Sequence, residues 1–178
     1  MNNVVSCFLA VCLIAACAYP EKATCQIGER QASASEMLNG ITQKHPVTYI
    51  QLAAELFNQG KKDEAVVWYY VGQMRYRAHL MANPDLEPSG EPALYSSLMQ
   101  VVGQPINEYA GSDADNWERL ITKAIAWNAE HENAFTPKSR FPEIYREVED
   151  NFMEFKKYVA ENKADIIKAR KENGLSGG

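Results

Sequence analysis

The sequence predicts an all-α fold: a compact helical domain that follows a short, apolar N-terminal segment. From residue 36 onward, apolar residues recur at intervals of three and four, which is the repeat of one helix face. The alternation of apolar and polar residues that is typical of strands is scarce in the same region. A chain of 178 residues is long enough for one such domain with a substantial core.

Composition and charge narrow the classes of partner. The chain is 46% hydrophobic and 23% charged, which is ordinary for a globular protein. Its net charge is -5, and every charged side chain lies at or after Glu21. Because a protein that binds nucleic acid needs a basic surface to neutralise phosphates, we expect no nucleic-acid partner.

The first residues of the chain predict an export signal. The apolar run over residues 4–18 is shorter than the roughly 20 residues that a membrane-spanning helix needs. Its apolar side chains would surround the helix axis and leave no polar face, which disfavours a buried first helix of the domain. A run of this length fits the hydrophobic region of a secretory signal.

Two cleavage sites are compatible with this signal. Ala16-Cys17-Ala18 has the small-x-small form of an ordinary signal-peptidase site, which would release a soluble chain from Tyr19. Ile14-Ala15-Ala16-Cys17 resembles the lipobox of bacterial lipoproteins, in which the cysteine receives a diacylglycerol and becomes the first mature residue. The segment departs from that family at Met1-Asn2-Asn3, which has no Lys or Arg. An uncleaved segment is the third alternative.

The lipoprotein resemblance implies a location in the cell envelope. It implies a signal peptide over residues 1–16, a lipid on Cys17 and attachment to a membrane. A residue other than Asp after the cysteine, here Ala18, implies the periplasmic side of the outer membrane. Two acyl chains are enough for stable anchoring.

Residues 17–35 are expected to form the lipidated N-terminus and a tether. They carry Pro20, Gly28 and mixed charge, with little apolar periodicity. Cys25 is expected there as an unpaired thiol, or as a link between two molecules in an oxidising compartment. Because all four cysteines lie in the first 25 residues, we expect neither a disulfide framework nor a CxxC metal site in the domain over residues 36–178.

Residues 46–82 predict a pair of helices. The first begins at Pro46 and ends near Gly60, a residue suited to the left-handed cap. The second begins near Asp63, whose carboxylate suits an N-cap, and runs to about Ala82.

This pair resembles one tetratricopeptide or Sel1-like repeat. The residues that carry the resemblance are Tyr49, Leu52, Ala53, Leu56, Ala65, Tyr69 and Gly72. Small residues at Ala53, Ala65 and Gly72 would let the two helices approach closely. These families usually mediate protein–protein contacts, so the resemblance implies a protein-binding module. Only one clear copy is present, which predicts a compact domain rather than a long solenoid.

The second helix of the pair is expected to be central, because it is apolar on two sides. Its aromatic residues are Trp68, Tyr69, Tyr70 and Tyr76. They are interpreted as packing, with the alternative that one edge of the cluster opens into a groove. Arg75 and Arg77 are expected to pair with an acid of residues 83–118 or to cap loop carbonyls. The alternative makes Arg75, Tyr76 and Arg77 a partner-binding surface, since arginines among tyrosines are common in binding hot spots.

The rest of the chain predicts further helices separated by loops. We expect a loop over residues 83–92, a short helix over residues 93–102, and mostly loop over residues 103–115. A helix follows from Asn116 to near Glu132, and one long helix begins at Pro142. The last helix is acidic early and basic late, which complements the helix dipole.

No catalytic motif is present. His45, His79 and His131 form no HExxH pattern, and we expect each to be structural or on the surface. Neither a Gly-rich phosphate loop nor a nucleophile elbow occurs. We therefore expect no enzyme activity, no metal and no cofactor. The expected function is that of an envelope-anchored protein-binding module, with an immunity protein against a secreted bacterial toxin as one form. The alternatives are a structural accessory of an envelope complex, and a small-ligand carrier or enzyme.

Overall fold

The computed structural model describes residues 32–175, and every regular element in this range is helical. The predicted all-α fold is confirmed. Within this range no helix is both long enough and apolar enough to cross a membrane. The predicted signal peptide, Cys17 and Cys25 lie outside the described residues.

The helical domain begins inside the predicted tether. Helix α1 (Ala34–Leu38) is capped by Ser33, whose hydroxyl accepts a hydrogen bond from the Glu36 backbone N–H. The Glu36 carboxylate accepts one from the Ser33 N–H at 2.7 Å, which completes a capping box. A short 3-10 helix, η1 (Ile41–Gln43), follows. Helix α1 thus begins two residues before residue 36, where the sequence-based prediction starts the domain.

Helices α2 (Val47–Asn58) and α3 (Lys62–Ala82) form the predicted antiparallel pair. Gly60 joins them with φ +79°, in the left-handed region that favours glycine. Gly72 lies where the helices cross, and a Cβ there would lie 2.9 Å from Ile50 Cγ1 and 3.3 Å from the Ile50 backbone nitrogen. Glycine therefore permits the close approach. The helix pair is present, and its family resemblance stays a prediction.

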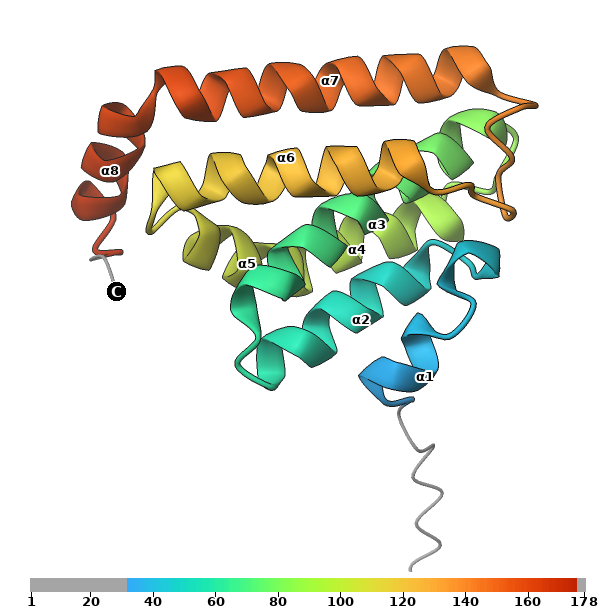
Figure 1. Ribbon diagram of the computed structural model, residues 1–178, viewed down its shortest axis with the longest axis horizontal. Coiled ribbons are helices and arrows are strands. Elements are labelled where there is room, and N and C mark those ends of the chain that lie inside the picture. The colour runs from blue at the N-terminus through green and yellow to red at the C-terminus, as the bar shows by residue number, and fades with distance from the viewer. Residues whose placement is uncertain (1–31, 176–178) are drawn as a thin grey trace, which may run out of the picture. The chain divides into compact units, whose positions relative to one another are not determined.

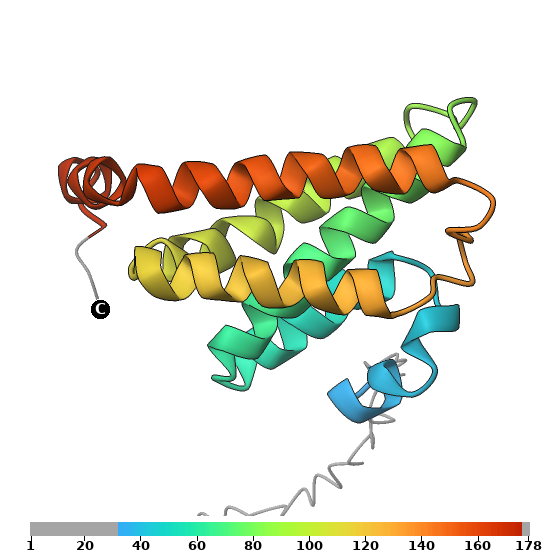
Figure 2. The ribbon, with the colours of Figure 1, turned by 45° about the horizontal axis from the view of Figure 1, so that its top comes forward.

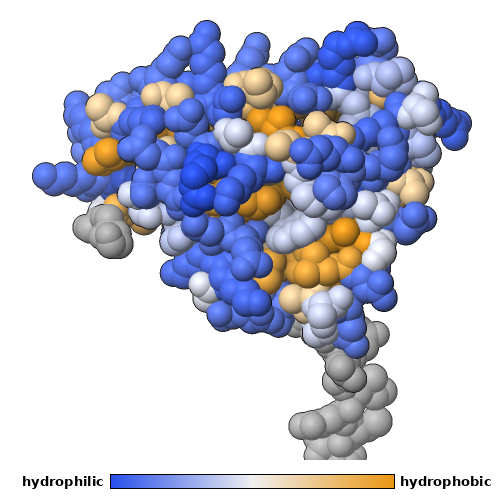
Figure 3. Space-filling view, viewed as in Figure 1, coloured by the Kyte–Doolittle hydropathy of each residue, from blue (hydrophilic) through white to orange (hydrophobic). Residues whose placement is uncertain are grey.

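Helix α3 is the central element of the domain. It contacts α2, α4 (Glu91–Val101), α5 (Gly103–Ala110), α6 (Ala114–Glu130) and α7 (Pro142–Glu161). Figures 1 and 2 show α7 and α6 stacked along one side of it, with α2 on another. Of the predicted aromatic cluster, Tyr69, Tyr70 and Tyr76 are buried. On the face drawn in Figure 3 the surface is mostly hydrophilic, with separate apolar patches.

Residues 103–115 are not mostly loop, as the glycine and prolines had suggested. Helix α5 occupies Gly103–Ala110, with Pro105 in its first turn. A backbone N–H in the first turn has no acceptor within the helix, so a proline costs little there. Asp113 then caps α6, and its carboxylate accepts a hydrogen bond from the Asn116 N–H at 3.0 Å.

The long C-terminal helix is broken in two. Helix α7 ends at Glu161, and α8 (Lys163–Glu172) continues in another direction (Figure 1). The Asn162 side chain donates a hydrogen bond to the Tyr158 carbonyl at 2.8 Å, which takes up a carbonyl at the helix end. Lys163 then pairs with Glu118 of α6 at 3.0 Å. These contacts turn α8 onto the start of α6.

Candidate functional site

The three residues predicted to bind a partner have different environments on α3. Arg75 and Tyr76 are both 0% exposed, whereas Arg77 is exposed. A partner that approaches the surface can therefore contact Arg77 but not the side chains of Arg75 and Tyr76. For those two residues the structure corrects the prediction of a surface role.

Arg75 links α3 to α2 and to the C-terminal end of α6 through hydrogen bonds in the interior of the domain. Its guanidinium donates hydrogen bonds to the Tyr49 hydroxyl at 2.6 Å, to Asn128 Oδ1 at 3.3 Å and to the His131 carbonyl at 3.0 Å. The rings of Tyr49 and Trp127 lie 5.0 and 4.9 Å from its Cζ atom. Burial lowers the pKa of Arg75 from its ordinary value. The prediction that an arginine caps a loop carbonyl is confirmed here. Neither Arg75 nor Arg77 forms an ion pair within residues 32–175.

A cleft opens between α3, α5, α6 and α7, and we name it the aromatic cleft. Its volume is about 410 Å³, and it is lined by Tyr70, Gln73, Arg77, Asn107, Trp117, Asn151, Phe152 and Phe155. The Tyr70 hydroxyl accepts a hydrogen bond from Trp117 Nε1 at 2.6 Å and donates one to Asn107 Oδ1 at 2.8 Å. These bonds fix the aromatic wall from three different helices. Tyr70 borders the cleft but is only 1% exposed, so for this residue the interpretation as packing holds.

Arg77 is the positive group of the aromatic cleft. Its guanidinium carbon lies 5.7 Å from the centre of the Phe152 ring, and its Nε donates a hydrogen bond to the Tyr95 hydroxyl at 3.2 Å. In the described part of the chain, its terminal nitrogens have no hydrogen-bond partner. A guanidinium that is held over an aromatic ring and still has free N–H donors can bind an acceptor on a partner.

A second cleft continues from the first, and we name it the α8 cleft. It has a volume of about 540 Å³, and Asn107 and Trp117 line both clefts. Its outer wall belongs to α7 and α8, with Tyr158 at 57% exposed and with Ile166 and Arg170. The break at Asn162 creates this wall, because an unbroken α7 would run straight past the N-terminal end of α6. The two clefts adjoin at Asn107 and Trp117, and we name them together the groove.

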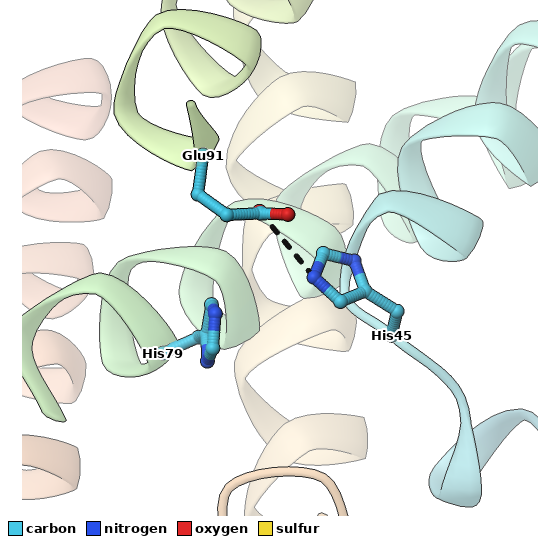
Figure 4. A group of neighbouring side chains, drawn as sticks. All are labelled: His45, His79 and Glu91. Carbon is cyan, nitrogen blue, oxygen red and sulfur yellow. Dashed lines mark ion pairs between the residues drawn. The ribbon is translucent and has the colours of Figure 1, made fainter. Parts of the chain in front are cut away.

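A separate group of side chains brings His45, His79 and Glu91 together, and we name it the His–Glu cluster (Figure 4). His45 precedes α2, His79 lies in the last turn of α3, and Glu91 opens α4. One ligand atom from each lies within 4.8 Å of the others. His45 Nε2 is 3.3 Å from Glu91 Oε2.

Neighbouring groups fix the His–Glu cluster in place. The Tyr76 hydroxyl donates a short hydrogen bond to Glu91 Oε2, and burial followed by this contact raises the pKa of Tyr76. The Phe135 ring packs edge-on against both imidazoles, at 4.6 Å from His45 and 5.0 Å from His79. Burial, followed by the nearby His45, lowers the pKa of His79, and Glu91 opposes the shift. His79 is therefore mainly neutral at neutral pH.

Sequence reasoning treated the histidines one by one and missed this cluster. No motif spacing links residues 45, 79 and 91. The predicted helix pair did contain one clue. In an antiparallel pair that turns at Gly60, the segment before the first helix lies beside the end of the second, which places His45 near His79. His131 lies elsewhere, stacked on Trp127 with ring centres 4.1 Å apart.

Comparison with known proteins gives one similarity. An uncharacterized protein of Haemophilus influenzae is 35% identical over 86 residues, which cover 48% of this chain and 33% of that protein. The match therefore spans about a third of the length of that relative. No family model matches the chain, and no solved structure matches it.

Proposed function

We propose that this protein is an envelope lipoprotein, anchored through Cys17, whose helical domain binds a protein partner in the groove formed by the aromatic cleft and the α8 cleft. The carrying observation is the lining of the aromatic cleft. It combines the part-exposed rings of Trp117 and Phe155, which lie beside the buried Tyr70 and Phe152, with an arginine and three amide side chains. Aromatic residues and arginine dominate binding hot spots, because they offer large contact areas with polar ends.

The groove also offers both apolar and polar groups, as the binding of a protein ligand requires. Its lining includes both rings and amides, so a partner can bury apolar side chains while its backbone groups find hydrogen-bond partners. The partner is expected to present a carboxylate or carbonyl oxygen to Arg77, which is the exposed cation of the aromatic cleft. A toxin that an immunity protein blocks is one partner of this kind, and a subunit of an envelope complex is another.

Affinity capture from solubilised envelope tests the groove. The full chain is used as bait, the captured protein is identified by mass spectrometry, and its affinity is then measured with purified components. Arg77→Ala is expected to weaken binding at least tenfold, as a hot-spot truncation does. Arg146→Ala is the matched control, because Arg146 is exposed on α7 and, among residues 32–175, its ion pair is with Glu143 alone. Equal affinities for the two variants would place the binding surface elsewhere.

Survival assays separate the two kinds of partner. Cells that lack the gene are challenged with neighbouring strains that deliver toxins. An immunity protein predicts that deletion lowers survival and that the Arg77→Ala chain restores it poorly. Unchanged survival, together with capture of a stable complex from unchallenged cells, identifies a structural accessory instead.

A small-ligand carrier is the second candidate, and the same cleft favours it. A volume of about 410 Å³ lies in the range of small-molecule sites, and the amide-bearing residues Gln73, Asn107 and Asn151 belong to its lining. Native mass spectrometry of the purified chain distinguishes the candidates. A retained small molecule that is lost in Arg77→Ala supports the carrier, whereas a ligand-free chain that binds its protein partner excludes it.

A further inference from the structure

We propose that His45, His79 and Glu91 bind one divalent cation of the zinc type. This site is separate from the groove, so the inference does not depend on the proposed function. It also departs from the sequence-based expectation that the chain holds no metal.

The donor set selects the class of cation. Two imidazoles and a carboxylate are the ligands that borderline cations such as zinc prefer, whereas magnesium and calcium favour oxygen donors. Three protein ligands leave a fourth position for water or for a group from another molecule. All three side chains are part-buried, which shields a bound ion while leaving that position accessible.

The distances approach those of a zinc site. Zinc bonds of about 2.0–2.1 Å in tetrahedral geometry place neighbouring ligand atoms about 3.3 Å apart. His45 Nε2 and Glu91 Oε2 already have this separation, at 3.3 Å. No pair of ligand atoms exceeds 4.8 Å, so closing the site requires His79 to shift by at most about 1.5 Å. Figure 4 shows the three side chains converging from three segments of the chain.

The surroundings provide support for the ligands. The Tyr76 hydroxyl donates to Glu91 and orients its carboxylate, as groups behind a metal ligand commonly do. The Phe135 ring limits the rotation of both imidazoles.

Existing hydrogen bonds to both imidazoles must change when the cation binds. Asn83 Nδ2 lies 3.2 Å from His79 Nδ1 and must turn away from the ring. The Val47 N–H donates to His45 Nδ1 at 3.1 Å, so the neutral ring carries its proton on Nε2, toward Glu91. A cation on Nε2 takes the place of that proton, which moves to Nδ1. Val47 is the first residue of α2, where the N–H has no acceptor within the helix and can turn to water. Its amide therefore reports binding at His45.

Isothermal titration of the purified full chain with zinc chloride tests the site. We expect one zinc ion per chain, with excess magnesium failing to compete. His79→Gln and Glu91→Gln are each expected to weaken zinc binding at least 100-fold. His131→Gln is the matched control, since His131 lies outside the cluster, and it should bind zinc like the wild type.

Two further readouts make the result unambiguous. The NMR amide resonance of Val47 should shift on zinc addition in the wild type and stay in place in His79→Gln. Circular dichroism confirms that the variants are folded. The N-terminal cysteines are intact in every variant, so zinc that is held by thiols would persist in His79→Gln and Glu91→Gln. That outcome, or the absence of stoichiometric binding to the wild type, would overturn the proposal.

Discussion

Two arginines separated by a single residue of α3 have opposite environments. Arg75 is completely enclosed and satisfied by uncharged partners, the hydroxyl of Tyr49, the amide of Asn128 and the carbonyl of His131. A buried charge of this kind is tolerated only when its donors are satisfied. Arg77 lies on the exposed side of the same helix and borders the aromatic cleft.

Substitution of each arginine by methionine should separate the two roles. Arg75→Met removes a charge that is costly to bury, and it also leaves Asn128 and His131 with unsatisfied buried acceptors. We expect a net loss of about 3 kcal/mol in the free energy of unfolding. Arg77→Met should change that free energy by less than about 0.5 kcal/mol. Urea unfolding monitored by circular dichroism measures both, and equal effects would contradict the assignment.

The sequence could not distinguish the two arginines. Both lie in a tyrosine-rich segment of a helix that is apolar on two sides. Which of the two faces solvent depends on how the neighbouring helices pack against that helix. The acids of residues 83–118 suggested ion pairs, yet Glu91 meets Tyr76 and His45 instead. Contacts between distant residues decide such cases, and periodicity carries no information on them.

At the scale of the helices, Asp63 shows how an expected cap can have another role. Helix α3 begins at Lys62, and Lys61 is its cap residue. The Asp63 carboxylate accepts hydrogen bonds from the Tyr109 hydroxyl and the Asn116 amide, both at 2.9 Å. It also pairs with Arg119 at 3.1 Å. Asp63 therefore joins the start of α3 to α5 and α6.

This junction predicts a dependence of stability on pH. Burial alone would raise the pKa of Asp63, but the bonds from Tyr109, Asn116 and Arg119 outweigh it and lower the pKa. A lowered pKa means that the stabilisation is complete above the unfolded value of about 3.9 and is lost as the pH falls through the folded value.

Asp63→Asn should therefore be less stable than the wild type at pH 7, by about 1 kcal/mol or less because the pair is partly exposed. The difference should shrink below about pH 4. Thermal unfolding at a series of pH values measures it, with Asp150→Asn, a surface acid on α7, as control. A difference that stays constant down to pH 2.5 would exclude Asp63 as the source.

The ends of helices were predictable where a proline or glycine marks them, and less predictable where they depend on contacts with other helices. Pro46, Gly60 and Pro142 mark ends that depend on neighbouring residues alone, and the structure has them there. Pro105 misled the prediction, since a proline ends one helix and begins another with equal ease. The turn at Asn162 depends on the contact of α8 with α6, which no local pattern reveals.

For the whole molecule, the all-α fold followed from periodicity, whereas both candidate sites required the assembled helices. The groove has walls from α3, α5, α6, α7 and α8, and the His–Glu cluster joins three segments. The described domain contains no cysteine, because all four lie in residues 1–25. The domain over residues 32–175 therefore folds without a disulfide of its own.

The anchor is tested on the whole chain. Cys17→Ser should abolish labelling by radioactive palmitate in growing cells, and it should move the protein from the membrane fraction to the soluble fraction. Cys25→Ser is the matched control and should keep both properties. Labelling that persists in Cys17→Ser would overturn the proposed lipid attachment.

The α8 cleft and the first described helix, α1, lie in different parts of the domain. The described domain starts beside α1, whereas α8 and the wall that it adds to the groove lie at the opposite end in both ribbon views (Figures 1 and 2). Under the proposed anchor, the lipid is attached to a residue that precedes α1 in the sequence. The described residues that line the groove all lie between Tyr70 and Leu175, so the proposed anchor and the proposed binding surface use different parts of the chain.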